Sequence, residues 1–296
     1  MSADNASPHV FIRFWGVRGS TPAPGPETVY VGGNTTCVEI RVGNEIIILD
    51  AGTGIRRLGL ALAEEFQNQP LSASLLISHT HWDHIQGFPF FLPAWDARNS
   101  IRILGMESAQ SSLRNILAGQ MDSVYFPVPM RSMPGYINIK DLNEMHFHIG
   151  EVPVTACIVN HPGPAAGYRF HTPAGDIVFI PDNEPSGPRW WGTPEKPGLE
   201  KAVSEFIRDA DILICDAQYD AEEYAKRIDW GHGAIDDVVK LAANNNVGKL
   251  YLFHHDPDHD DARVMAMSRH ATDLAHELGS PLKIHIAREG LKVDLA

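Results

Sequence analysis

The stretch SHTHWDHIQG, from Ser78 to Gly87, places three histidines and an aspartate within six residues. It directly follows the apolar run LLI at residues 75–77, which is typical of a buried strand. Alternate residues of a strand point to the same side, so the first two histidines lie together at its carboxyl end. The chain must then turn into the next helix. Four side chains of types that bind metals therefore converge from one loop: His79, His81, Asp83 and His84.

This HxHxDH pattern predicts a metal site, because a buried cluster of polar groups without partners or a metal would be costly. A lone HxH pair carries much less weight. The chain has one at His146 to His148 with no Asp-His after it, and there we expect one face of an exposed strand.

The composition indicates an ordinary globular protein. With 296 residues, of which 44% are hydrophobic, the chain is long enough to bury a sizeable core. We expect a disordered N-terminal tail at residues 1–9 and a single domain at residues 10–296. No apolar run is long enough to span a bilayer, and the start MSADNASPH lacks the regions of a secretory signal. We therefore expect a cytoplasmic protein without a membrane partner.

The formal net charge of −13 argues against broad binding to long nucleic acids, whose phosphates are neutralised mainly by Lys and Arg. A small anionic substrate is compatible with this charge, because a local pocket can hold one phosphate. The three cysteines, Cys37, Cys157 and Cys215, lie scattered in apolar segments. They predict buried small side chains rather than disulfides or a cysteine metal site.

Short apolar runs alternate with helical patterns, which is typical of an α/β fold. Strands are expected at Val10–Trp15, Cys37–Val42, Glu45–Leu49, Ser74–Ile77, Ile101–Leu104, Val154–Val159, Ala166–Phe170, Ile177–Ile180, Ile212–Ile214, Leu250–Phe253 and Lys283–Ile286. Helices are expected at Ile55–Gln67, Glu107–Leu117, Leu199–Arg208, Ile235–Asn244 and Asp261–Leu278. Two long irregular stretches, Gly16–Asn34 and Ala118–Met145, are candidate walls or lids of a site.

Four further strand-like runs also end in a residue that can bind a metal. TACIVN leads to His161, DIVFIP to Asp182, ILIC to Asp216 and KLYLF to His254. In α/β folds the site lies outside the carboxyl ends of the strands, so we expect these residues to meet the HxHxDH loop.

These motifs resemble those of the metallo-β-lactamase-fold hydrolases. Within that superfamily the chain is most similar to the branch of ribonuclease Z and the cyclic phosphodiesterase of the phosphonate pathway. The likeness runs from FIRFWGVRGSTP through ILDAGTG and SHTHWDH to LFHHDP. It implies an αββα sandwich, with two mixed sheets flanked by helices, that binds two divalent metal ions. Imidazole and carboxylate ligands suit Zn²⁺ as our first expectation, with Mn²⁺ or Fe as alternatives.

The resemblance also implies which residues hold each metal. The first metal is expected at His79, His81 and His161. The second metal is expected at Asp83, His84 and His254, with Asp182 bridging the two ions. Pro-Asp-Asn stands at the bridge where the family has Gly-Asp-Thr, so Asp216 stays an alternative to Asp182, as His255 does to His254.

An acid–histidine pair follows from the same resemblance. In the phosphodiesterase branch an acidic residue after this strand partners a histidine at the start of the following helix, and Asp216 and His232 match that pair. We expect His232 to be the general acid, oriented by Asp216, and we count Asp83 with them as a catalytic residue. The alternative for His232 is a helix-capping or surface histidine.

Two further residues have two interpretations each. Asp50 either orients a ligand histidine or caps the helix that starts near Ile55. Arg18, in the Gly-rich loop after the first strand, is expected either to neutralise charge that develops on the substrate or to form an exposed salt bridge.

The expected reaction is hydrolysis of a phosphodiester, in which two metals activate water and His232 protonates the departing oxygen. No basic arm for gripping tRNA is evident between His84 and His161, so we expect a small substrate such as a cyclic nucleotide. Candidate aromatic residues for stacking on a base are Tyr125, Phe126, Trp190 and Trp191. The alternatives are a thioester or lactone hydrolase, an RNA-processing nuclease, a diiron redox protein and a non-catalytic binding module. The resemblance also suggests a homodimer.

Overall fold

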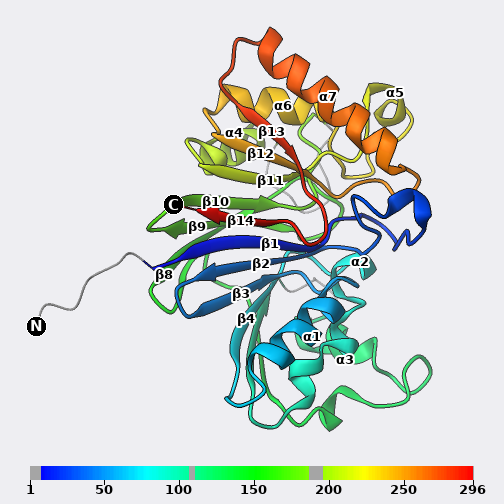
Figure 1. Cartoon of the computed structure of the whole chain (residues 1–296), viewed down its shortest axis with the longest axis vertical. Coiled ribbons are helices and arrows are strands. Elements are labelled where there is room, and N and C mark those ends of the chain that lie inside the picture. The colour runs from blue at the N-terminus through cyan, green and yellow to red at the C-terminus, as the bar shows by residue number, and fades with distance from the viewer. Residues whose placement is uncertain (1–7, 107–110, 187–195, 296) are drawn as a thin grey trace, which may run out of the picture.

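The computed structural model describes residues 8–106, 111–186 and 196–295. Two seven-stranded sheets pack face to face, and helices cover the outer side of each (Figure 1). The expected α/β class and αββα sandwich are therefore confirmed. Most of the expected N-terminal tail lies outside the described residues, but within it His9 Nε2 lies 2.9 Å from Asp294 Oδ1.

The first sheet takes most of its strands from the first half of the chain. In spatial order it contains β14 (Lys292–Leu295), β1 (Val10–Gly16), β2 (Cys37–Val42), β3 (Glu45–Leu49), β4 (Ser72–Ile77), β5 (Ser100–Gly105) and β6 (Tyr136–Asp141). The pairs from β14 to β3 are antiparallel, and the pairs from β3 to β6 are parallel. The sheet is therefore mixed, as expected.

The second sheet repeats this arrangement with strands from the second half of the chain. In spatial order it contains β13 (Lys283–Ile286), β12 (Lys249–Phe253), β11 (Ile212–Asp216), β10 (Gly175–Ile180), β9 (Ala166–Thr172), β8 (Val152–Ile158) and β7 (His146–Ile149). The pairs from β13 to β10 are parallel, and those from β10 to β7 are antiparallel. Each sheet thus has a parallel half, whose strands all end at the same edge.

The helices form the two outer layers. On the first sheet lie α1 (Ile55–Glu65) and α3 (Leu113–Gly119), and on the second lie α4 (Lys196–Ile207), α6 (Ile235–Asn244) and α7 (Asp261–Glu277) (Figure 1). Short helical turns connect the strands to these layers: α2 (Trp82–Ile85), α5 (Ala221–Tyr224), and four 3₁₀ turns at Pro26–Thr28, Phe88–Phe90, Leu92–Trp95 and Met130–Ser132. Among the described residues, no helix is both long and apolar enough to cross a membrane.

The run IIIL in β3 shows how the sequence builds these layers. Successive side chains of a strand point to opposite faces, so a strand buried on both faces must be apolar throughout. Ile47 and Leu49 point into the core between the sheets, whereas Ile46 and Ile48 pack against the helices of the first sheet. Each such side chain contributes about 1.5–3 kcal/mol when it is fully buried.

The structure also differs from the sequence expectations in places. The stretch 118–145, expected to be irregular, contains β6, whose alternation of half-buried and exposed residues is a weak signal at a sheet edge. Strand β14 was not expected at all. The helix expected from Glu107 begins only at Leu113, where Ser112 caps it, and residues 107–110 lie outside the described residues. The exposed strand expected at His146 to His148 is confirmed as β7, with both histidines exposed.

Candidate metal centre

The histidines and aspartates singled out in the sequence meet where the parallel halves of both sheets end. Their nitrogen and oxygen atoms form overlapping groups, and within each group the atoms lie within 4.8 Å of one another. These groups are His79–His81–His161, His79–His84–Asp182, Asp83–His84–His254, His161–Asp182–His232 and Asp216–His232–His254. All seven expected ligands therefore belong to one cluster.

The first half of the chain supplies its residues from a single loop after β4. His79 is buried directly behind the strand. His81 has an extended backbone and is the N-cap of α2, and the first turn of that helix contains Asp83 and His84, both buried. Helix α2 is only four residues long, and its single turn directs these two side chains into the interior.

The second half supplies its residues one strand at a time. His161 follows β8, Asp182 follows β10 and His254 directly follows β12. All three are buried: His161 is 1% exposed, Asp182 1% and His254 0%. Because β10, β11 and β12 run parallel, the residues after them reach the same edge.

Asp182 lies between the two groups of ligand-type residues. Its Oδ1 is 3.2 Å from His84 Nε2 and 3.3 Å from His254 Nε2. Its Oδ2 is 3.6 Å from the Nε2 atoms of His79 and His161. One carboxylate oxygen thus faces each side, which is the arrangement of a bridging ligand. Asp216, the alternative bridge, instead accepts hydrogen bonds from backbone amides and from His232.

The residues of the cluster fit divalent metal ions. Among the described residues, the buried atoms His79 Nε2, His84 Nε2 and Asp182 Oδ1 have no hydrogen-bond partner, although they face one another. Buried polar atoms are almost always paired, so lone pairs that converge without hydrogen bonds indicate a cation between them. Histidine nitrogens and carboxylate oxygens without a cysteine are donors that suit Zn²⁺, Mn²⁺ or Fe.

A partner on the far side of the ring fixes several of these histidines. His84 Nδ1 lies 2.8 Å from Asp50 Oδ2, His254 Nδ1 lies 3.0 Å from Gln218 Oε1, and His161 Nδ1 lies 2.8 Å from the Gly231 carbonyl oxygen. Each partner is an acceptor, so each Nδ1 carries the proton and each Nε2 offers its lone pair to the cluster.

These contacts decide two alternatives that the sequence left open. Asp50 lies against His84, while the N-cap of α1 is Gly54. His254 points into the cluster, whereas His255 Nε2 lies 3.0 Å from the carbonyl oxygen of Ala287.

The backbone is strained at two of these positions. Asp50 and His254, which directly follow β3 and β12, have φ angles of 60° and 58°. The left-handed region costs a residue other than glycine about 1–3 kcal/mol, and such strain concentrates at functional sites. The loop Gly16–Asn34 packs against this region, because a Cβ on Gly19 would lie 2.3 Å from the His254 ring. Together with the Ser20 amide, which donates to Asp83 Oδ2 across 2.8 Å, this makes the loop one wall of the centre.

Burial and nearby charges favour neutral rings at His79 and His161 and positive charge at His84. Burial lowers the pKa of His79 well below its ordinary value and lowers that of His161 to about 3, so both rings are neutral, as metal ligands must be. Burial also opposes charge on His84, but nearby carboxylates raise its pKa well above the ordinary value: Asp83, Asp182 and Asp50. The carboxylates therefore attract a cation to this point.

His232 and Asp216 form a pair beside the cluster. His232 Nδ1 lies 3.0 Å from Asp216 Oδ2, and the His232 ring stacks on His254 at a centroid distance of 5.0 Å. Burial opposes the charged ring, but attraction from Asp216 outweighs it and raises the pKa of His232 to about 9. The N-cap of α6 is Ala234, so His232 is not a helix cap. Its side chain is 12% exposed, which leaves an approach from solvent.

Arg18 corrects a sequence expectation. It is neither exposed nor directed at the centre: the side chain is fully buried and donates to the carbonyl oxygens of Gly32, Asp256 and His259, at 2.7, 2.9 and 2.6 Å. The exposed salt bridge expected from the sequence is therefore wrong, whereas a role at the substrate stays a prediction. Arg18 instead ties the loop after β1 to the loop after β12.

Two of the four candidate stacking residues fall within the described part of the chain. Tyr125 is 79% exposed, and Phe126 packs edge-on against Phe90 at a centroid distance of 5.6 Å. Trp190 and Trp191 lie outside the described residues. Sequence reasoning also missed residues that shape the centre: Gln218, Gly231, Ser20 and Gly19. Gly231 stands directly before His232 in the sequence, but nothing in their residue types marked these four, because their roles depend on contacts distant in the chain.

Comparison with known proteins agrees with this geometry. The family profile described as "Beta-lactamase superfamily domain" matches residues 45–255, which is more than half of the chain. The chain therefore belongs to the beta-lactamase superfamily. Its fold and cluster make it a metal-dependent hydrolase of the metallo-β-lactamase fold.

The individual relatives are distant but extend over most of the chain. Ribonuclease Z from Bradyrhizobium sp. strain ORS 278 is 24% identical over 264 residues, which cover 78% of this chain and 86% of the relative. The fold of YhfI, a metallo-beta-lactamase fold protein from Bacillus subtilis, is similar with a TM-score of 0.69 at 15% identity, covering 97% and 99% of the two chains. A diphosphatase of the PhnP family gives a TM-score of 0.67 at 16% identity, covering 96% and 97%.

Proposed function

We propose that this protein is a dinuclear-metal-dependent phosphodiesterase that acts on a small phosphodiester such as a cyclic nucleotide. The observation that carries the proposal is the Asp216–His232 pair, held 3.0 Å apart beside a cluster with two sets of metal ligands. A hydrolase that only needs metal-activated water has no use for such a pair. A phosphodiesterase needs it, because a departing alkoxide must be protonated.

The ligand sets follow from the two sides of Asp182. We assign His79, His81 and His161 to one metal ion. Asp83, His84 and His254 would hold the other, and Asp182, whose two oxygens face the two sets, would be shared between them. Bound there, two divalent ions supply an activated water and stabilise charge on the phosphoryl oxygens. Zn²⁺ is the ion we propose first, with Mn²⁺ and Fe as alternatives.

The protein's own groups orient the reaction. Asp50 and Gln218 hold the rings of His84 and His254, so that each Nε2 faces the cluster. Asp216 holds the proton on His232 Nδ1 and orients the ring. The second nitrogen, Nε2, is then the atom that donates a proton to the leaving oxygen, which makes His232 the general acid.

Two observations support a small phosphodiester over the alternatives. The formal net charge of −13 disfavours a long polyanion, although ribonuclease Z relatives make an RNA-processing nuclease the second candidate. The similar fold of a diphosphatase from the PhnP family favours phosphate chemistry over thioester or lactone hydrolysis. That preference is part of the proposal and needs a direct test.

The test compares leaving groups in His232→Ala. Loss of a general acid should lower turnover of a cyclic nucleotide, whose leaving group is a ribose alkoxide, by about 10²–10⁴-fold. Turnover of bis(p-nitrophenyl) phosphate should fall far less, because p-nitrophenolate departs without a proton. The matched control is His270→Ala, at a histidine that lies away from the centre. Its Nε2 atom lies 2.6 Å from Asp236 Oδ1. Equal losses on both substrates with metal retained would contradict the role of His232.

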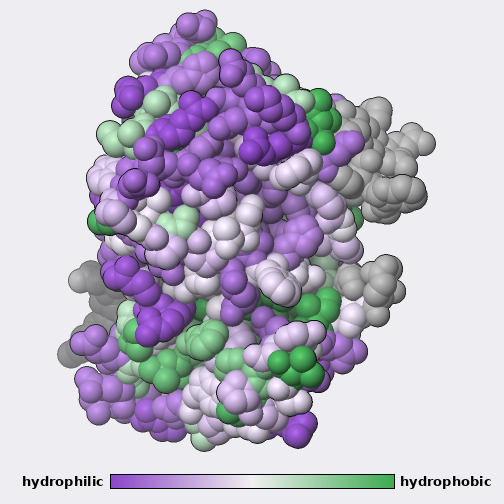
Figure 2. Space-filling model, turned by 90° about the vertical axis from the view of Figure 1, so that its right-hand side faces the viewer, coloured by the Kyte–Doolittle hydropathy of each residue, from purple (hydrophilic) through white to green (hydrophobic). Residues whose placement is uncertain are grey.

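We further propose a cytoplasmic, single-domain protein that forms a homodimer. The three free cysteines suit a reducing compartment. Exposed apolar side chains gather over the lower half of the face in Figure 2, the half that contains α1 and α3. Val124 and Tyr125, in the segment between α3 and β6, are each 79% exposed, and exposed apolar patches often mark an interface. Light scattering on the purified chain decides between monomer and dimer.

A further inference from the structure

We propose that Glu184 is a positioning residue that holds the segment 224–231 in the shape that places His232 and His161. The proposal rests on the proposed function of His232. It adds a residue whose side chain binds the segment before His232. Glu184 lies two positions after Asp182, at the end of β10, and its side chain is 0% exposed.

The Glu184 carboxylate accepts three hydrogen bonds from one neighbouring segment. Oε1 accepts from the Tyr224 hydroxyl at 2.8 Å and from the Asp229 amide at 3.0 Å. Oε2 accepts from the Gly231 amide at 2.9 Å. A buried carboxylate is costly unless several donors satisfy it, so these three contacts account for its place in the interior.

The two amides that Glu184 binds belong to two residues of the segment with positive φ angles. Asp229 has a φ angle of 74° and Gly231 has one of 84°, both in the left-handed region. Glycine adopts this region freely, but at Asp229 the conformation is strained and persists only where the surroundings enforce it. Glu184 therefore fixes the backbone on both sides of Trp230, immediately before His232.

Gly231 contacts His161 and directly precedes His232, so its position affects two residues of the centre. Its carbonyl oxygen lies 2.8 Å from His161 Nδ1, and its next neighbour in sequence is His232. The backbone also approaches His161 so closely that a Cβ on Gly231 would lie 2.4 Å from His161 Nδ1. A shift of this segment would consequently rotate the His161 ring and displace His232.

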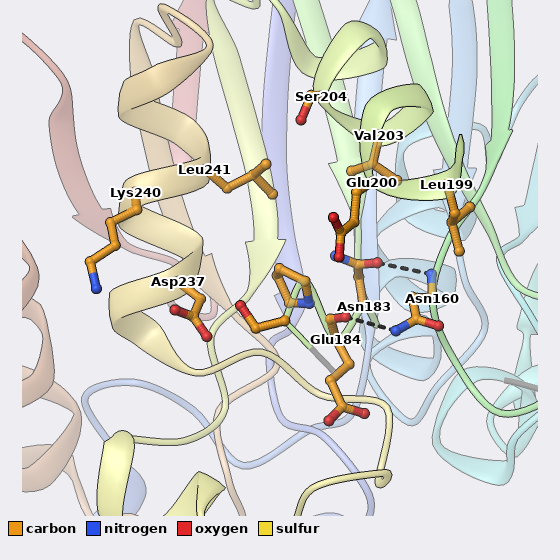
Figure 3. A pocket seen from close by; sticks show the side chains of 12 residues that line it. Asn160, Asn183, Glu184, Leu199, Glu200, Val203, Ser204, Asp237, Lys240 and Leu241 are labelled. Atoms are coloured by element: carbon orange, nitrogen blue, oxygen red, sulfur yellow. Dashed lines mark hydrogen bonds between the residues drawn. The ribbon is translucent and has the colours of Figure 1, made fainter. Parts of the chain in front are cut away.

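The other side of Glu184 is anchored to the strand ends. Its amide donates to the Asn160 carbonyl oxygen at 2.8 Å, and Asn160 Nδ2 donates to the Glu184 carbonyl oxygen at 2.8 Å. Asn183 Oδ1 accepts from the Asn160 amide at 2.9 Å, and its own amide donates to Asp216 at 3.3 Å. Figure 3 shows Asn160 and Asn183 side by side, with the Glu184 carboxylate directed away from them. Glu184 thus links the ends of β8 and β10 to the catalytic segment.

The test replaces Glu184 with glutamine, which keeps the size and the backbone contacts. A glutamine offers one acceptor oxygen and turns an NH₂ group toward a donor, so at least one of the three contacts is lost. We expect turnover of a cyclic nucleotide to fall about 10–100-fold, as for other residues that orient a ligand or catalytic group. Turnover of bis(p-nitrophenyl) phosphate should fall less than that of the cyclic nucleotide, because it depends on the placement of His161 but does not need the proton from His232.

A second readout does not depend on activity. In the metal-free protein, Glu184→Gln should accelerate hydrogen–deuterium exchange in residues 225–233 and leave α7 unchanged. The control is Glu289→Gln, since Glu289 is also a largely buried carboxylate that accepts a backbone amide, that of Asn34 at 2.6 Å. It should change neither the exchange of residues 225–233 nor the ratio of the two turnovers.

The outcomes separate this proposal from the proposed function. If His232→Ala discriminates between the leaving groups but Glu184→Gln neither does so nor alters exchange, the role of Glu184 is overturned and the function stands. If the wild type hydrolyses no phosphodiester, the function fails and the exchange result alone decides whether Glu184 holds the segment. Should Glu184→Gln not fold, Tyr224→Phe removes one of the three contacts. It must then change exchange of residues 225–233 in the same direction, and unchanged exchange overturns the proposal.

Discussion

The two halves of the molecule build their shares of the metal centre in opposite ways. The first half supplies four ligand-type residues from one loop after β4 and a fifth residue, Asp50, that orients one of them. The second half supplies one residue after each of β8, β10 and β12, and a histidine–aspartate pair between them. Both halves nevertheless use parallel strands that end at the same edge and a strained residue at that edge. The first half takes its ligands from one short stretch of sequence, whereas the second half depends on the fold to bring its residues together.

The largest expected effect comes from Asp182, whose carboxylate faces ligands from both halves. Asp182→Asn keeps the shape but removes the charge from the carboxylate that faces both ligand sets. Since a metal supplies several kcal/mol of transition-state stabilisation, phosphodiester turnover should fall by about a thousandfold. Elemental analysis should show fewer than two metals per chain. Full metal content with full activity would show that Asp182 is not the bridge.

The next prediction compares Asp50 and Gln218, which orient one ligand histidine in each half. Asp50→Asn replaces the charged acceptor of His84 Nδ1 with a neutral amide, Gln218→Leu removes the acceptor of His254 Nδ1, and we expect metal affinity to fall about 10–100-fold in each. The loss should be larger for Asp50, because the carboxylate also attracts positive charge to His84. Competition with a chelator measures both values. A larger loss for Gln218→Leu would contradict this ranking.

A smaller effect concerns stability at the junction of the halves. Arg18 joins the loop after β1 to the loop after β12 through three carbonyl oxygens. Arg18→Met should lower the free energy of unfolding by about 3 kcal/mol, since hydrogen bonds from a charged donor contribute more than neutral ones. Urea denaturation measures the change. An unchanged unfolding midpoint together with lost turnover would restore Arg18 to a role in binding substrate.

The smallest effect tests the other HxH pair. His146 and His148 lie exposed on β7, at the edge of the second sheet. His148→Ala should change the free energy of unfolding by less than about 0.5 kcal/mol and leave metal content unchanged. Loss of a bound metal in this variant would reveal a site that the exposed edge does not suggest.

These contrasts explain how much the sequence could predict. The HxHxDH loop is local, so strand alternation and the following turn suffice to bring its residues together. The ligands of the second half could be assigned to the same site as this loop, because each of them also follows an apolar strand. Gln218 and Glu184 could not be found this way, because an amide and a carboxylate acquire their roles only through contacts with residues about 36 and 47 positions away.

Arg18 shows the opposite failure. An arginine in a Gly-rich loop beside a predicted anion site suggests contact with substrate, but its guanidinium donates to backbone carbonyls of the two loops. Sequence patterns predict which charges approach a site and do not predict which backbone groups will need a donor. The edge strands β6 and β14 were missed for a related reason, since half-buried edges carry a weak apolar pattern.

The most direct test of the account measures metal content and hydrolysis on one sample. Elemental analysis should give about two divalent metals per chain, the number that two ligand sets joined by Asp182 require. The same sample should hydrolyse bis(p-nitrophenyl) phosphate and at least one cyclic nucleotide, and leave a thioester and a lactone intact. Two metals with thioester or lactone cleavage and no phosphodiester turnover would contradict the proposed function, while the fold and the metal centre would stand.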